Sequence, residues 1–207
     1  MRLQSILTAT PSVLGKANTP TGILKVETTD EVELNETGLH GDFQSDKRVH
    51  GGFEKAVYQY PIENYKMLAE ALPHLAEKFK QPCIGENFSS QGMQDEDVYI
   101  GDIYRVGTAL LQVSQPRMPC WKLNHHIGNA HMQALLIAFN RSGWYYRVLE
   151  PGKVKAGNEF TLVERVQSEF SVEKVWVLWN ELRENKQTEV PNIDIKGLSN
   201  EWTFNWG

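Results

Sequence analysis

The chain has 207 residues, of which 41% are hydrophobic and 23% charged, a composition typical of one folded domain with at most a small appendage. Its net charge of −5 disfavours duplex nucleic acid as a partner. No apolar run approaches the roughly 20 residues that span a bilayer, and the first residues lack the features of a signal peptide. We therefore expect a cytoplasmic protein that binds no membrane.

Short β-prone runs separated by turn residues fill the first 60 positions. A helix is predicted over Pro61–Glu70, because proline stands at its first position and apolar residues recur three and four apart. Pro73 interrupts this helix. The predicted strands are Leu3–Thr8, Ile23–Thr28, Val32–Leu34 and Ala56–Tyr60.

The middle of the chain continues the same pattern, with one further helix predicted over Asn129–Asn140. Many short strands with few embedded helices, and no alternation of strand with helix, indicate a mainly β barrel or sandwich, of which we favour the barrel. The strands predicted here are Asp97–Ile100, Ile103–Val106, Ala109–Ser114, Tyr145–Leu149 and Phe160–Val166.

A small helical tail is predicted after Val166, because apolar residues recur with helical spacing behind the N-cap candidate Ser171. Leu198–Phe204 predicts another short helix, capped by Ser199. The sequence therefore divides into a β-barrel domain over 1–166 and a C-terminal helical module over 167–207.

Nucleotide-binding loops, the serine-hydrolase elbow and the helical zinc-protease motif are all absent from the sequence. Four other stretches combine glycine with polar or reactive side chains. They are Gly38–Asp42, Val49–Val57, Ile84–Phe88 and Ser114–Leu123.

Cys120 is the candidate reactive thiol, because it follows Pro119 at the end of a predicted strand with Arg117 and Lys122 nearby. Neighbouring cations stabilise a thiolate, the form that ligates metals or attacks electrophiles. The alternative is a small buried hydrophobic residue, which is our interpretation of Cys83. A zinc site combining these cysteines with His125 and His126 is disfavoured, since the spacing matches no standard ligand pair.

His50 is the candidate polar residue of the second stretch, since Gly51 and Gly52 allow a close backbone approach to a ligand and Lys55 adds positive charge. The alternative is a solvated histidine beside turn-forming glycines. Asp42 and Asn87 also follow or neighbour glycine. The Asn87 amide could orient a heterocycle, although turn formation explains both residues nearly as well.

The stretch Ser114–Lys122, with its Pro-Arg-Met-Pro-Cys core, resembles the MOSC family, named after the C-terminal domain of molybdenum cofactor sulfurase. The other glycine-containing stretches, followed by Val98–Asp102, occur in the order found in the stand-alone bacterial YiiM-like branch of that family. The tail resembles the short three-helix module of the same branch. The resemblance covers nearly the whole chain, and four ordered motifs are more specific than any one of them.

The resemblance implies a β-barrel of the pyruvate kinase insert type, with molybdenum bound by a pterin dithiolene and one protein thiolate. Carried over by motif, Cys120 is the molybdenum ligand. Arg117, Lys122, His50 and Lys55 face the anionic pterin and its phosphate, and Gly51, Gly52 and Asn87 provide close backbone or amide contacts.

The implied activity is the reduction of N-hydroxylated compounds, such as 6-hydroxylaminopurine, to amines, with electrons from a separate reductase. His50 is then the candidate proton donor or substrate-orienting group, and Asp42 the next choice. Two alternatives remain open, a sulfur carrier with a persulfide on Cys120 and a non-catalytic cofactor carrier. The sequence also leaves a homodimer open.

Overall fold

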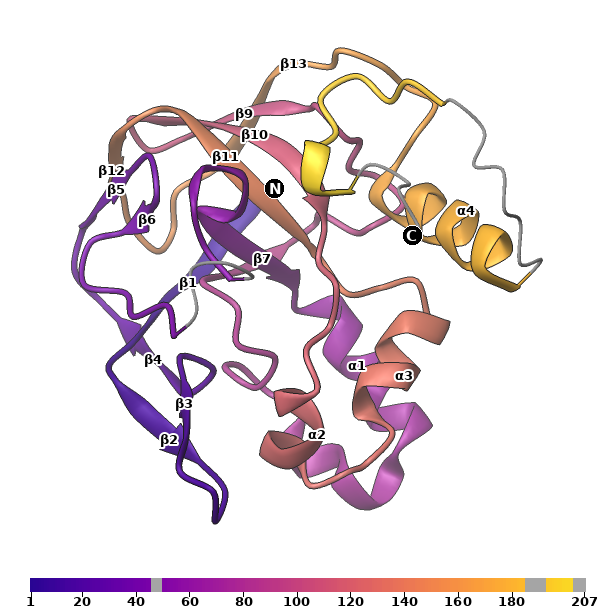
Figure 1. Ribbon diagram of the computed structural model, residues 1–207. Helices are drawn as coiled ribbons and strands as arrows, with labels where there is room; N and C mark the ends of the chain where they lie inside the picture. The colour runs from indigo at the N-terminus through magenta and orange to yellow at the C-terminus, as the bar shows by residue number, and fades with distance from the viewer. Residues whose placement is uncertain (46–49, 185–192, 203–207) are drawn as a thin grey trace.

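The computed structural model describes residues 1–45, 50–184 and 193–202 (Figure 1). Its helices are η1 (Phe53–Lys55), α1 (Glu63–Ala71), η2 (Pro73–Lys78), α2 (Lys122–Ile127), α3 (Met132–Ala138), α4 (Val172–Glu184) and η3 (Asn200–Trp202). Its strands are β1 (Arg2–Ala9), β2 (Ser12–Leu14), β3 (Thr19–Thr21), β4 (Lys25–Thr28), β5 (Val32–Asn35), β6 (Gly38–Leu39), β7 (Val57–Pro61), β8 (Phe88–Gln91), β9 (Ile103–Val106), β10 (Ala109–Pro116), β11 (Trp144–Glu150), β12 (Gly152–Val154) and β13 (Phe160–Glu164).

One eight-stranded sheet dominates the molecule, in the order β13-β9-β10-β11-β7-β8-β1-β4. Only the pair β7 and β8 within it is parallel. A three-stranded sheet, β12-β5-β6, and the hairpin of β2 and β3 complete the β-structure. The prediction of a mainly β protein with embedded helices is confirmed.

The two ends of this sheet approach one another without forming a continuous ladder. The Leu3 amide donates to the Asn158 carbonyl at 2.9 Å, and the Phe160 amide donates to the Met1 carbonyl at 3.1 Å. These bonds place the start of β13 beside β1. Among the described residues no closed cycle of paired strands is present, so the closed barrel stays a prediction.

Most predicted strands and helices are present, but the strand predicted over Asp97–Ile100 is wrong. Its backbone forms local turns, in which the Asp97 amide donates to the Gln94 carbonyl at 2.9 Å. β8 and α2 have no counterpart among the predicted elements, and the helix predicted over Asn129–Asn140 is shorter in the structure, as α3. The Asn129 side chain accepts the His131 amide at 2.8 Å, which holds the residues before α3 in a turn.

Two hydrophobic cores lie on opposite sides of the central strands, because side chains alternate between the two faces of a strand. Trp144 and Tyr146 of β11 enter the first core, together with the apolar face of α4. Tyr145, between them, enters the second core against α1, α2 and α3. Figure 1 shows these three helices grouped together, and α4 contacts the group at α3, where the Asn180 side chain donates to the Ile137 carbonyl at 3.2 Å.

The helical tail begins where the sequence predicts, since the Ser171 hydroxyl accepts the Lys174 amide at 3.1 Å. Ser199 likewise accepts the Glu201 amide at 3.2 Å at the start of η3. Thr203 and Phe204 of the predicted last helix lie outside the described residues, as does Val49. The boundary at 166/167 stays a prediction.

In the described part of the chain, the helices are all too short or too polar to cross a bilayer.

Asp95 is a buried carboxylate that links α1 to the start of β11. It accepts hydrogen bonds from the Asn64 side chain and the Gly143 amide, both at 2.9 Å. Burial raises the pKa of Asp95 to about 6, although these donors oppose the change. The folded protein therefore binds a proton more readily at this site than the unfolded chain does.

The protein should become more stable as the pH falls through this pKa, since a raised carboxyl pKa adds stability on protonation and loses it as the pH rises. Between pH 7.5 and pH 5 we expect a gain of about 1 kcal/mol in unfolding free energy from Asp95. Urea unfolding of the wild type and Asp95→Asn at both pH values measures this. An equal pH dependence in the two proteins would contradict the assignment.

Candidate functional site

One cavity collects nearly all the side chains that the sequence analysis selected. Of the predicted site residues, Gly52 alone does not line it. The cavity is bounded by the chain around β4, the loops after β6 and before β8, the segment entering η1, and the segment from β10 into α2. Its lining includes Asp42, His50, Gly51, Lys55, Asn87, Arg117, Cys120 and Lys122.

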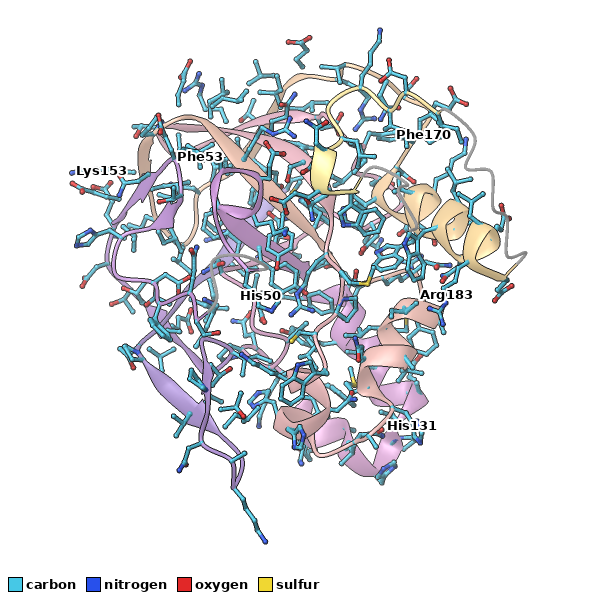
Figure 2. The ribbon with its side chains drawn as sticks, viewed as in Figure 1. His50, Phe53, His131, Lys153, Phe170 and Arg183 are labelled. Atoms are coloured by element: carbon cyan, nitrogen blue, oxygen red, sulfur yellow. The ribbon has the colours of Figure 1, made fainter. Side chains whose placement is uncertain are left out.

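The His50 loop enters the cavity through two glycines in the left-handed region, Gly51 at φ 107° and Gly52 at φ 84°. A Cβ atom on Gly51 would lie 2.1 Å from the Gln44 side-chain oxygen, which would have to move, and the positive φ of Gly51 itself favours glycine. Figure 2 shows His50 toward the centre of the view and His131 at the periphery, beside α3. Gly51 lines the cavity beside His50, and the close approach of its backbone to a ligand stays a prediction.

Asp42 is the centre of a buried polar cluster on the cavity wall. Its Oδ1 accepts the Lys25 ammonium at 2.6 Å and the Ala9 amide at 2.7 Å. Its Oδ2 accepts the Asn87 amide at 2.8 Å. Asp42 thus accepts three hydrogen bonds from the protein itself, and this arrangement supports a structural role for Asp42 over that of proton donor.

Asn87 joins this cluster to the sheet. Its Oδ1 accepts the Tyr58 amide at 3.2 Å, and its Nδ2 also donates to the Leu7 carbonyl at 3.2 Å. The side chain therefore ties β1 to β7 next to the cavity. Its predicted contact with a cofactor stays a prediction, and these bonds support the interpretation of Asn87 as a structural residue.

Arg117 places a buried guanidinium in the wall of the cavity, with 5% of the residue exposed. Its carbon Cζ lies 4.6 Å from the centre of the Tyr58 ring. Burial alone would lower the pKa of Arg117, but Tyr58, Tyr145 and Cys120 raise it above its ordinary value. The group is charged, yet its Nε and Nη1 have no hydrogen-bond partner in the structure.

Cys120 and Lys122 lie on the segment that leads from β10 into α2. Cys120 is half-buried and lines the cavity, whereas Cys83 is buried in the second core. Burial raises the pKa of the Cys83 thiol far above its ordinary value, which fits packing and not ligation. Lys122 Nζ donates to the Pro20 carbonyl at 2.7 Å and contacts Ser45 at 3.3 Å, which ties α2 to the β2–β3 hairpin.

Lys55 forms an ion pair with Glu201 of η3, so the C-terminal segment reaches the cavity. Among the described residues, four cationic side chains line the cavity, those of Lys25, Lys55, Arg117 and Lys122, together with one carboxylate, that of Asp42. An acidic chain has thus gathered positive charge at one site. Such a cavity favours an anionic ligand.

Sequence reasoning missed Lys25, Tyr58 and Tyr145 in the lining. Lys25 lies in a β-prone run with no motif around it, so nothing marks it as a site residue. The two tyrosines lie in predicted strands, where a core position is the simplest interpretation. Burial lowers the pKa of Lys25, although Asp42 opposes that change. Nothing in the local sequence signals the pairing of Lys25 with Asp42, because 17 positions separate them.

No group of three or more His, Cys, Asp or Glu side chains in the described residues is arranged to hold a metal ion. His125 lies instead against the Trp121 ring, at 5.5 Å between ring centres. The donors that the cavity does offer are one thiol and several cations. They fit an anionic group that brings its own metal ligands, and Arg117, which lines the same cavity, adds a buried positive charge.

Comparison with known proteins gives four findings. The family model described as the MOSC domain matches residues 46–161. Protein YiiM of Escherichia coli K12 is 41% identical over 184 residues, covering 89% of this chain and 82% of that protein. The crystal structure of YiiM from Escherichia coli superposes with a TM-score of 0.74 at 33% identity, covering 98% of this chain and 89% of the other. A protein of Gibberella moniliformis named "Reductase" is 36% identical over 151 residues, 72% of this chain and 27% of its own length.

Proposed function

This chain belongs to the MOSC domain family, and on that premise we propose that it binds a molybdenum cofactor and reduces N-hydroxylated compounds to amines. The observation that carries the proposal is the cavity itself. It combines an accessible thiol, Cys120, with a buried cation, Arg117, whose Nε and Nη1 have no partner. A buried guanidinium with unpaired donors is costly unless a ligand completes it.

We assign different residues of the cavity to different parts of the cofactor. The Cys120 thiolate is the soft donor for molybdenum. Arg117, Lys55 and Lys122 balance the negative charge of the pterin phosphate, and Gly51 allows the ligand to approach the backbone. When bound, the cofactor supplies the two-electron exchange that breaks the N–O bond.

The overall reaction converts R–NHOH, two protons and two electrons into R–NH₂ and water. We assign the electrons to a separate reductase. The oxygen that leaves needs a proton, and His50 is our candidate donor because it lines the cavity with Cys120. Asp42 is the weaker candidate, since its oxygens already accept three hydrogen bonds.

The proposal is tested with protein purified from a host that makes the cofactor, supplied with chemically reduced viologen and 6-hydroxylaminopurine. We expect adenine to accumulate catalytically. Cofactor-loaded protein that forms no amine from this base, or from other N-hydroxylated compounds, would argue for the cofactor-carrier alternative.

His50→Gln should lower turnover by about 100-fold while the molybdenum content stays at the wild-type level, because general acid catalysis contributes on that scale. Amine formation and metal content are measured on the same preparations. If molybdenum is lost as well, His50 belongs to the binding wall and its role as proton donor is wrong. His131→Gln, on the periphery beside α3, is the matched control and should leave both values unchanged.

A further inference from the structure

The position of Arg117 depends on the short segment that precedes β11. The Arg117 amide donates to the Gly143 carbonyl at 3.0 Å, and the Ser142 hydroxyl donates to the Arg117 carbonyl at 2.6 Å. The Tyr58 hydroxyl, beneath the guanidinium, donates to the Ser142 carbonyl at 2.8 Å. Both the backbone of Arg117 and the ring that supports its charge are therefore fixed by Ser142 and Gly143.

Helix α4 in turn fixes this segment. The Trp176 indole donates to the Ser142 hydroxyl at 2.9 Å, and all three groups in the chain from Trp176 to Arg117 are buried. A serine hydroxyl has one hydrogen to donate, and Ser142 donates it to the Arg117 carbonyl. The Ser142 oxygen can still accept a hydrogen bond, and it accepts the indole N–H of Trp176. The Arg141 guanidinium adds ion pairs to Glu96 at 2.6 Å and to Glu173 of α4 at 3.5 Å.

We propose that Trp176 and Ser142 are positioning residues for Arg117, so that the C-terminal helix sets the affinity of the cavity for anions. A guanidinium with unpaired donors keeps its geometry only if its surroundings hold it, and the contacts described above come from α4 and the 141–143 segment. The inference rests on the proposed role of Arg117 as an anion ligand. If Trp176 positions Arg117, the C-terminal helix contributes to anion binding as well as to the hydrophobic core.

The test uses inorganic pyrophosphate as the probe and the full chain without cofactor, with affinity measured by calorimetry. Trp176→Phe should weaken binding about 3- to 10-fold, the effect of losing one buried hydrogen bond. Trp202→Phe is the matched control, because Trp202 packs against Trp176 in the same core, with 5.1 Å between the two ring centres. It should leave the affinity within about 2-fold of the wild type, since it removes no hydrogen bond to Ser142.

A double-mutant cycle separates positioning from general loosening of the fold. In an Arg117→Gln background, Trp176→Phe should have no further effect on pyrophosphate binding. An equal loss in both backgrounds, or no loss in either, would overturn the proposal. Absence of any pyrophosphate binding by the wild type would do the same, because Arg117 would then not be an anion ligand.

A second measurement covers the case in which Arg117→Gln binds too weakly to measure, or Trp176→Phe fails to fold. The side-chain Nε–H signal of Arg117 is followed by nuclear magnetic resonance in the wild type and in Ser142→Ala. We expect faster hydrogen exchange of this group in the variant, and an unchanged rate would contradict the proposal. Failure of the reductase function is distinct, since it leaves pyrophosphate binding and its dependence on Trp176 intact.

Discussion

Asp42→Ala should lower the free energy of unfolding by about 3–5 kcal/mol, because it leaves a buried ammonium without its partner. Lys25 has 5% of its side chain exposed and Asp42 has 4%, so solvent replaces little of what is lost. The Ala9 amide and the Asn87 side chain lose an acceptor in the same step. Urea unfolding followed by tryptophan fluorescence at pH 7.5 measures the change.

The double variant Lys25→Met with Asp42→Asn distinguishes a broken ion pair from a damaged strand. It removes both charges, and we expect it to be more stable than Asp42→Ala. Asp30→Ala, at an exposed position, is the control and should change stability by less than about 0.5 kcal/mol. A loss below about 1 kcal/mol for Asp42→Ala would mean that this cluster is solvated and that Asp42 is free to act in proton transfer.

Cys120→Ala should lower N-hydroxylamine turnover by at least about 100-fold, because the metal loses the one protein ligand that we assign to it. The fold should survive, since Cys120 is half-buried on a connecting segment. Amine formation is measured at equal protein concentration, with unfolding midpoints recorded for both proteins.

Cys83→Ala is the matched control for this variant. Cys83 packs in the second core, so its loss should reduce stability by about 1–2 kcal/mol and leave turnover per folded molecule unchanged. If both variants lost turnover equally, the assignment of Cys120 as the reactive thiol and Cys83 as a packed one would be wrong.

Much of the fold follows from local patterns in the sequence. The β-prone runs of β7 and β11 and the caps Ser171 and Ser199 each depend on a few neighbouring residues, so they could be predicted. The turn over Asp97–Ile100 could not, because it is stabilised by distant partners: the Val172 amide donates to the Val98 carbonyl at 2.8 Å. Tertiary contacts override a β-prone composition there.

Local motifs in the sequence select part of the lining of the candidate site. Glycine with a neighbouring polar residue, and proline beside cysteine, selected Asp42, His50, Asn87 and Cys120, and the fold brings these four into one cavity. The wall could not be predicted, because Lys25 meets Asp42, and Trp176 meets Ser142, only through the fold.

We propose that Cys120 and the cationic cavity together hold molybdenum. The most direct measurement is the molybdenum content, by mass spectrometry, of the wild type, Cys120→Ala and Cys83→Ala purified from a host able to make the cofactor. We expect about one metal per chain in the wild type and in Cys83→Ala, and none in Cys120→Ala, since a soft thiolate is the proposed protein ligand. A wild-type protein without molybdenum after gentle purification would contradict this proposal and favour persulfide transfer by Cys120.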